Sequence, residues 1–252
     1  MLRPPQKANV YGYLSTRSGV DAVTDSASVI VPLLREIFHP DSVLDIGCGT
    51  GDWLSVFQAT GSRKICGYDG VWVPKDSMKI KSENFRTIDF YGDFSITERF
   101  DFALCLEVAE HVSREVSEKM VRVMCGCADV VLWSAAIPGQ GGYEHINERY
   151  QDHWIEVFKA QGFTAFDLVR PKVWMNEKVS WWYQQNCLVF ANAPACQKYS
   201  LTPEPFVPVL IHPLLYESAR DPKNYSVSQI VRTVPHYLTR RFSTKKSKLA
   251  RH

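Results

Sequence analysis

Residues 43–53, VLDIGCGTGDW, join a short apolar run to three glycines at alternate positions, Gly47, Gly49 and Gly51. The run SVLDIG is typical of a buried parallel strand, and residues 51–60 have the apolar spacing of a short helix. Glycines at such a junction permit positive φ angles and let the backbone approach a ligand closely. Since ligands of open parallel sheets bind beyond the carboxyl ends of the strands, this stretch predicts a strand, a turn and a helix that belong to a binding site.

On both sides of this stretch, strand and helix patterns alternate along the chain. A helix that begins at Asp25 or Ser26 is predicted to run through Ile37. Further strands are predicted at KICGYD, NFRTIDF, FDFALCLEV, ADVVLWSAA, TAFDLVR and QNCLVFAN, and further helices at Arg114–Met124 and RYQDHWIEVFKAQGF. The alternation indicates βαβ units, and therefore an α/β fold whose mostly parallel sheet is covered on both faces. The last two strands lack a long helix between them, which predicts an antiparallel edge pair.

The composition divides the chain into three parts. Residues 1–24 form an irregular lead-in, residues 25–195 carry the α/β pattern, and residues 196–252 combine a proline-containing extension with a basic tail. The prolines predict an extended segment laid over the domain rather than a second core. Eight Lys or Arg residues and no acidic residue follow Asp221. Such a tail is either a solvated end or a contact for phosphate, from RNA or from a lipid surface.

The overall composition excludes several classes of protein. With 252 residues and 45% apolar side chains the chain can bury one sizeable core, and its formal net charge is only +2. It has no apolar run long enough to span a membrane, and its N-terminal residues lack the apolar segment of a secretory signal. Seven irregularly spaced cysteines without a C-x-x-C pair indicate reduced thiols, so the predicted location is cytoplasmic. The oligomeric state stays open.

Acidic residues around the glycines indicate which ligand the turn binds. Turns that bind the pyrophosphate of NAD read G-x-G-x-x-G, but here Asp52 stands in the place of the third glycine. A carboxylate at that helix N-terminus would repel a diphosphate. Asp45 suits an ammonium group, and Asp69 ends the second strand, where it can accept hydrogen bonds from both hydroxyls of a ribose. A cationic adenosine cofactor therefore fits better than NAD.

Four segments carry a resemblance to a known family. VLDIGCGTG, GYDG, TIDF and FDFALCLEVAEHV resemble, in order and spacing, the signature segments of the class I S-adenosylmethionine-dependent methyltransferases, over about residues 25–192. The resemblance implies a Rossmann-like, seven-stranded, mostly parallel sheet with an antiparallel last strand, and S-adenosyl-L-methionine as cofactor. By position, it implies a cofactor site made of Asp45, Gly47, Cys48, Gly49 and Gly51 at the methionine part, Asp69 at the ribose, Asp89 and Phe90 at the adenine, and Leu106 and Glu107 at the pocket floor.

Candidate catalytic residues follow the fourth and fifth predicted strands. Glu110 and His111 belong to the pattern E-x-x-E-H that begins at Glu107, and His145 and Glu148 lie in the segment PGQGGYEHINERY. The set is similar to the metal site of ubiquinone-pathway O-methyltransferases and of small-RNA 2′-O-methyltransferases, so a divalent ion is possible. It is not favoured, and no residue is assigned as a metal ligand. His145 as a metal-free general base and His145 as a structural histidine are the alternatives.

The segment SAAIPGQGGYEHINERYQDHW is predicted to be a flexible loop over the active-site edge, and it resembles a loop of bacterial methyltransferases from polysaccharide or secondary-metabolite pathways. Four aromatic residues before the last strand either pack the sheet edge or line an acceptor pocket: Trp174, Trp181, Trp182 and Tyr183. The predicted function is O-methylation of a small molecule or a saccharide. The alternatives are an RNA 2′-O-methyltransferase, with RNA bound through the basic tail, and a cofactor-binding scaffold without turnover.

Overall fold

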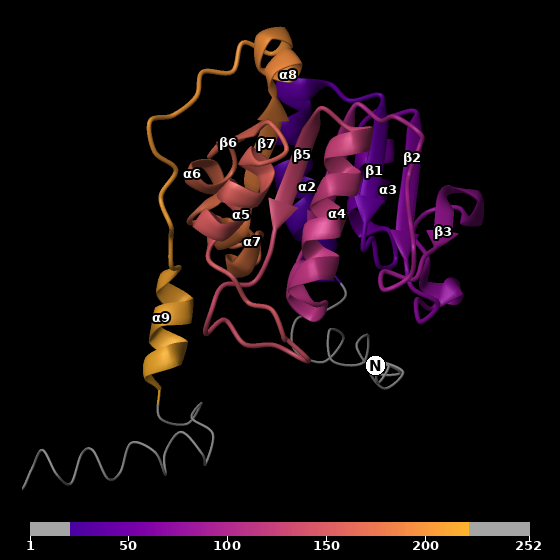
Figure 1. Cartoon of the computed structure of the whole chain (residues 1–252). Coiled ribbons are helices and arrows are strands. Elements are labelled where there is room, and N and C mark those ends of the chain that lie inside the picture. Colours follow the sequence, from indigo (N-terminus) through magenta and orange to yellow (C-terminus); the bar gives the residue numbers. More distant parts are fainter. Residues whose placement is uncertain (1–20, 222–252) are drawn as a thin grey trace, which may run out of the picture. The chain divides into compact units, whose positions relative to one another are not determined.

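The computed structural model describes residues 21–221 (Figure 1). The predicted lead-in, apart from its last residues, and the basic tail lie outside the described residues. The elements, in chain order, are α2 (Asp21–Phe38), β1 (Ser42–Ile46), α3 (Asp52–Ala59), β2 (Lys64–Asp69), η1 (Lys75–Ser77), η2 (Ser82–Asn84), β3 (Phe85–Thr87), β4 (Phe102–Leu106), η3 (Ala109–His111), α4 (Arg114–Cys127), β5 (Val130–Ser134), α5 (Gln151–Lys159), β6 (Phe163–Phe166), α6 (Arg170–Val173), α7 (Trp181–Asn186), β7 (Leu188–Asn192), α8 (Ala193–Lys198) and α9 (Pro213–Arg220).

The seven strands form one sheet in the order β3-β2-β1-β4-β5-β7-β6. Neighbouring strands from β3 to β5 are parallel, and β7 is antiparallel to both β5 and β6. The predicted α/β fold is confirmed, including the antiparallel last strand. The chain order reverses between β1 and β4, and ligands of such sheets bind at this switch point.

Helices cover both faces of the sheet, with α4 on one side and α2 on the other (Figure 1). Strand side chains alternate between two apolar clusters: Leu104 belongs to the cluster with α2 and α3, and Cys105 to the cluster with α4 and α5. The strands are buried on both faces, and this explains why their sequences read as continuous apolar runs. Because this double core holds every strand in place, the loops at the strand ends have a rigid frame.

Some elements differ from the sequence-based prediction. The strand predicted over NFRTIDF is only three residues long, because its pairing with β2 ends at the bond from the Ile88 N–H to the Asp69 carbonyl (2.8 Å) and Asp89 then begins a turn. The residues QN at the start of the last predicted strand belong instead to α7. This short helix buries Tyr183 edge-on against Trp53, with ring centroids 5.2 Å apart, and a strand in its place would lose that contact.

The residues after α8 extend over the domain as far as His212, where the compact unit ends. Helix α9 belongs to a second unit. Among residues 21–221 we find no helix whose length and apolar character would let it cross a lipid bilayer.

Candidate functional site

The glycine turn (residues 47–51) follows β1 and leads into α3. The N–H groups of Gly47 and Cys48 both donate to the Tyr68 carbonyl, at 2.7 and 3.2 Å, which fixes the turn against β2. Gly47 has φ +81°, and a Cβ there would lie 2.4 Å from Cγ2 of Val108. A side chain is therefore excluded at Gly47 by its backbone conformation and by its packing.

Cys48 contributes its backbone to this turn, and its thiol lies 3.6 Å from the Gly49 carbonyl oxygen. Its side chain is buried against Gly67 of β2, where an added Cβ would lie 2.6 Å from the Cys48 sulfur. Burial and the nearby carboxylates raise the pKa of the thiol, so it stays protonated at neutral pH.

Asp69 lies at the end of β2 and holds the turn from the other side. Its Oδ2 accepts the Gly49 N–H at 2.7 Å and its Oδ1 accepts the Gly70 N–H at 2.6 Å. The side chain is buried, and this burial raises the pKa of the carboxyl even though two N–H groups stabilise the charged form. A carboxylate has further lone pairs, so Asp69 can also accept hydrogen bonds from a ligand.

Asp45 is buried within β1, beside Gly67 of β2 and Leu104 of β4. Burial raises its pKa well above the usual value, and the charges of Asp69 and Asp52 raise it further. Several carboxylates therefore converge at the switch point of the sheet. A positively charged ligand would relieve this repulsion, whereas a dinucleotide would add to it. The glycine turn, Asp45 and Asp69 therefore suit the positively charged amino acid part and the ribose of S-adenosylmethionine.

Asp52 begins α3, and its charge is compensated within the protein. Its carboxylate pairs with Lys79 Nζ at 2.6 Å and accepts hydrogen bonds from the hydroxyls of Thr24 and Thr50, both at 2.6 Å. These partners lower the pKa of Asp52 in spite of its partial burial. The repulsion of a diphosphate that the sequence analysis assigned to Asp52 is therefore weak, and the preference for a cation rests on Asp45 and Asp69.

Replacing Lys79 with methionine is expected to lower the free energy of unfolding by about 1–2 kcal/mol, because Asp52 would keep its partly buried charge without the ammonium partner. Since the pKa of Asp52 is lowered on folding, this stabilisation is present above the unfolded pKa, about 3.8, and is lost as the pH falls through the folded value. Denaturant unfolding at pH 7 measures it. Arg63→Met, which removes an exposed pair with Asp41, is the control and should leave stability unchanged.

The residues predicted at the adenine differ in their surroundings. Asp89 is exposed, and its Oδ1 accepts the Tyr91 N–H of its own turn at 3.0 Å. Phe90 is buried against Phe94, with ring centroids 6.0 Å apart. Leu106, at the end of β4, is buried beneath the same edge of the sheet. Asp89 is accessible to a base, while Phe90 belongs to the core under α4.

Glu107 follows β4 with φ +55°, a conformation rare for a residue with a side chain. The hydroxyl of Ser134 donates to its Oε1, the amide of Asn186 donates to Oε1 at 3.2 Å, and the amide of Gln140 donates to Oε2 at 2.8 Å. Burial raises the pKa of Glu107, and these three donors oppose that shift. Strain of this kind is typical of functional sites, where surrounding contacts hold it in place.

Glu110 lies in η3 and is fully buried. Neither carboxylate oxygen makes a hydrogen bond of standard geometry with the described residues, and burial together with the Glu107 carboxyl raises the pKa of Glu110 well above its usual value. Its carbonyl oxygen accepts the N–H groups of Ile146 and Asn147, at 2.8 and 3.1 Å. These two bonds place the rim loop (residues 137–150) directly over η3.

His145 of the rim loop is oriented by Glu148. Its Nδ1 lies 3.0 Å from Glu148 Oε1, and the two Glu148 oxygens also accept the N–H groups of Gly139 and Gly141, at 2.9 and 2.8 Å. A Cβ at Gly142 would lie 2.2 Å from His145 Nε2, so only glycine leaves room for the imidazole. Glu148 therefore connects the loop backbone to the imidazole ring.

Three of the predicted side chains come together over η3. One ligand atom each of Glu110, His111 and His145 lies within 4.8 Å of the others, and the rings of His111 and His145 meet edge to face with centroids 4.9 Å apart. Among the described residues the buried carboxylate of Glu110 has no hydrogen-bond partner of standard geometry, which fits either a protonated carboxyl or a bound cation. Two imidazoles and a carboxylate suit Mn²⁺, Fe²⁺ or Zn²⁺ at least as well as Mg²⁺.

The sequence analysis missed the polar residues around Glu107 and η3. The residues are Ser134, Gln140, Asn147, Gln185 and Asn186. One signal was available, because three consecutive amides, Gln184 to Asn186, directly precede an apolar strand. Buried amides need hydrogen-bond partners, so such a run indicates a polar network inside the fold.

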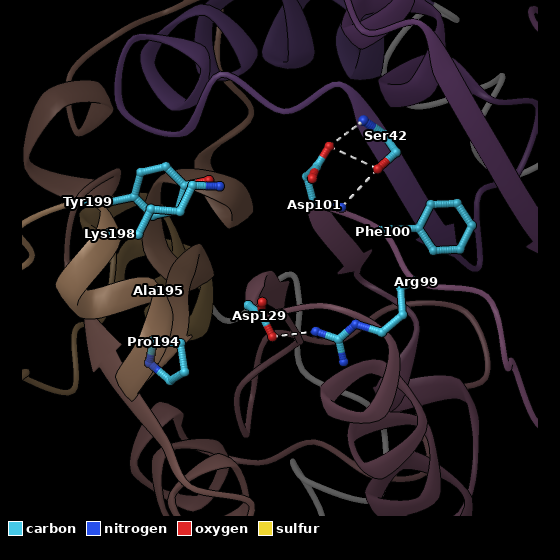
Figure 2. A pocket seen from close by; sticks show the side chains of 9 residues that line it. All are labelled: Ser42, Arg99, Phe100, Asp101, Asp129, Pro194, Ala195, Lys198 and Tyr199. Carbon is cyan, nitrogen blue, oxygen red and sulfur yellow. Dashed lines mark hydrogen bonds and ion pairs between the residues drawn. The ribbon is translucent and has the colours of Figure 1, made fainter.

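The opposite edge of the sheet also contains a hollow, with a volume of about 220 Å³ (Figure 2). Three of its charged groups already have partners, since Asp101 accepts the N–H and hydroxyl of Ser42 and Arg99 pairs with Asp129. Ligands of this sheet type bind at the other edge. We therefore assign no function to this hollow.

Comparison with known proteins supports the same conclusion as the geometry. Residues 24–122 match the sequence model of a family described as a methyltransferase domain. That range contains the glycine turn, Asp69, Asp89 and the E-x-x-E-H segment, while the rim loop lies beyond it. Among curated proteins, no sequence relative was found.

Several solved structures share the fold. The sugar N-methyltransferase KedS8 from Streptoalloteichus sp ATCC 53650 is 14% identical, with a TM-score of 0.55 over 76% of this chain and 96% of that one. DesVI from Streptomyces venezuelae is 14% identical, with a TM-score of 0.53 over 76% and 100%. Magnesium protoporphyrin IX methyltransferase (ChlM) from Synechocystis PCC 6803, with bound SAM, is 18% identical, with a TM-score of 0.52 over 75% and 92%. Residues 24–122 are thus similar in sequence to a methyltransferase domain, and the chain shares the fold of these solved structures.

Proposed function

We propose that this enzyme transfers the methyl group of S-adenosylmethionine to a hydroxyl group of a small molecule or a saccharide. The observation that carries the proposal is the His145–Glu148 pair, which holds an oriented imidazole at the same sheet edge as the glycine turn. A hydroxyl acceptor needs a base to remove its proton, whereas an amine acceptor can react as the free base.

The cofactor would be held by Asp45 at its ammonium, by the turn at its methionine part, by Asp69 at its ribose and by Asp89 at its adenine. When bound, it supplies an electrophilic methyl group on a sulfonium, which is an excellent leaving group. The protein then has to hold the acceptor oxygen in line with that methyl group and exclude water. The rim loop over η3 is suited to both tasks.

His145 is proposed to take the acceptor proton at Nε2. Its Nδ1 faces the Glu148 carboxylate, and this contact favours the tautomer that leaves Nε2 as the acceptor. A positive charge formed on the imidazole would be stabilised by the carboxylate 3.0 Å away. Glu110, with its raised pKa, can donate a hydrogen bond to the acceptor in its protonated form.

Aromatic side chains near the same edge support a saccharide or a flat aromatic acceptor. Tyr183 is buried against Trp53, so it has a packing role, whereas Trp174, Trp181 and Trp182 are only half-buried. Trp174 lines an open hollow of about 820 Å³ beside α6. Exposed aromatic faces suit sugar rings.

An assay that detects S-adenosylhomocysteine release, run against matched panels of glycans, small hydroxylated metabolites and RNAs, tests the proposal. Turnover with a hydroxylated metabolite or glycan supports it. Turnover with RNA alone, abolished by truncation after Asp221, would establish the alternative function.

The second candidate function is metal-assisted transfer, as an RNA 2′-O-methyltransferase would use it. The convergence of Glu110, His111 and His145 within 4.8 Å favours it. These residues would hold the ion, and the ion would act as a Lewis acid toward a bound hydroxyl. Treatment with EDTA separates the mechanisms: activity that falls and returns with Mn²⁺ indicates a metal, and unchanged activity indicates the His145 base.

We also propose a reducing, cytoplasmic location. All seven cysteines are unpaired thiols, and most of them are buried. Unpaired buried thiols are typical of compartments in which disulfides do not form. Fractionation of the producing cells tests the location.

A further inference from the structure

Gln185 of α7 is fully buried and joins two segments that are distant in sequence. Its backbone carbonyl accepts hydrogen bonds from the side chains of Gln151, at 3.2 Å, and Arg170, at 3.4 Å. Its side-chain Oε1 accepts the backbone N–H of His212 at 2.8 Å, and its Nε2 donates to the Oε1 of Gln140 at 3.2 Å. A buried amide with all of its groups in use defines the positions of its partners.

On one side, Gln185 and its partners hold the strap (residues 201–212). Arg170 donates to the Pro208 carbonyl at 3.0 Å, Gln151 to the Leu210 carbonyl at 3.0 Å, and His212 donates to Gln185. Buried side chains thus bind the strap backbone at every second residue, as a neighbouring strand would. The strap is therefore integrated into the domain.

On the other side, Gln185 determines how Gln140 of the rim loop meets Glu107. The His212 N–H can only donate, so the Gln185 oxygen faces it and the Gln185 NH₂ group faces Asn186 and Gln140. Asn186 donates to the same Gln140 oxygen at 2.9 Å, so the Gln140 NH₂ group points to Glu107. The hydrogen bonds therefore all run in one direction, from the His212 N–H through the two glutamine amides to the Glu107 carboxylate.

We propose that Gln185 is a positioning residue for methyl transfer, which couples the strap to the rim loop and fixes the loop, through Gln140, on Glu107. The inference rests on the proposed function, because the loop it fixes carries His145. It makes residues 201–212 part of the frame of the acceptor site. The Pro-containing extension then serves the reaction as well as the fold.

The test compares Gln185→Leu with Gln184→Leu in the full chain. Gln184 is the adjacent buried glutamine, and its amide donates to the carbonyls of Asn176 and Val179 instead of to the rim loop. Backbone hydrogen exchange is followed by mass spectrometry. In Gln185→Leu, exchange should become about tenfold faster both in residues 137–147 and in residues 207–212. In Gln184→Leu it should change only near residues 176–180.

Kinetics give a second readout once an acceptor is known. Gln185→Leu and Gln140→Ala should each lower kcat about tenfold with unchanged affinity for S-adenosylhomocysteine, and the double variant should lose no more than either single variant. Gln140→Ala also covers the case in which Gln185→Leu does not fold, since it should free the loop and leave the strap protected.

Faster exchange in the strap alone, or additive kinetic losses, would refute the coupling. The exchange experiment needs no acceptor. It therefore decides whether Gln185 couples the strap to the rim loop even if the proposed function is wrong.

Discussion

Replacing His145 with alanine is expected to slow methyl transfer about 100-fold or more, the usual contribution of a general base. The affinity for S-adenosylhomocysteine should stay the same, because the ring lies over η3 and outside the glycine turn. Steady-state rates with the identified acceptor, together with calorimetry of S-adenosylhomocysteine binding, measure both quantities. His39→Asn, at an exposed histidine with φ +44°, is the control for loss of an imidazole, since asparagine tolerates that conformation.

Gly142→Ala should slow methyl transfer as His145→Ala does, although it leaves the histidine in the sequence. The added Cβ would lie 2.2 Å from Nε2 and would push the ring out of place. Full activity in His145→Ala would reduce the histidine to a structural part of the rim loop. Loss of cofactor affinity in the same variant would show that the loop, rather than a base, had failed.

Replacing Asp69 with asparagine is expected to weaken binding of S-adenosylhomocysteine by about 1.5–3 kcal/mol, roughly 10- to 150-fold, because hydrogen bonds from a ribose to a charged acceptor would be lost. Asparagine retains the size of the side chain and accepts one of the two N–H groups of Gly49 and Gly70, while its NH₂ group replaces the oxygen that accepts the other. Isothermal calorimetry measures the affinity. Because burial raises the pKa of Asp69, affinity in the unmodified enzyme should begin to fall, on acidification, at a higher pH than an exposed aspartate would cause.

Asp101→Asn is a matched control for this variant. Asp101 also accepts two backbone N–H groups, those of Asp41 and Ser42 at 3.0 and 2.8 Å, but it does so at the opposite edge of the sheet. It should lower thermal stability and leave the affinity for S-adenosylhomocysteine unchanged. Equal affinity losses in both variants would mean that Asp69 acts on the fold alone, and the ribose assignment would then be wrong.

The sheet could be predicted from sequence because its signals are local. The parallel strands β1, β2, β4 and β5 are mostly apolar runs of five or six residues, and the glycines mark the first turn by their conformational freedom. Helix α7 could not be found in this way, since it depends on the contact of Tyr183 with Trp53, which is distant in sequence. A short helix of six residues has little intrinsic stability, so tertiary packing decides its conformation.

The candidate site was predicted in part for a related reason. Residues directly after a strand, such as Asp69 and Glu107, can be placed at the sheet edge from sequence alone. The charge compensation of Asp52 by Lys79 could not be foreseen, because 27 residues separate the two partners and no pattern connects them. The role of Glu148 as the partner of His145 likewise depends on how the rim loop folds back.

The position of β7 has a consequence for biosynthesis. It is the last strand to leave the ribosome, yet it lies inside the sheet, between β5 and the edge strand β6. A nascent chain that has emerged only as far as β6 therefore holds an unpaired β5 flank and an unattached strand, both prone to pairing with other chains. Completion of the sheet must await synthesis of residues 188–192, so translation pauses before this point should increase the need for chaperones.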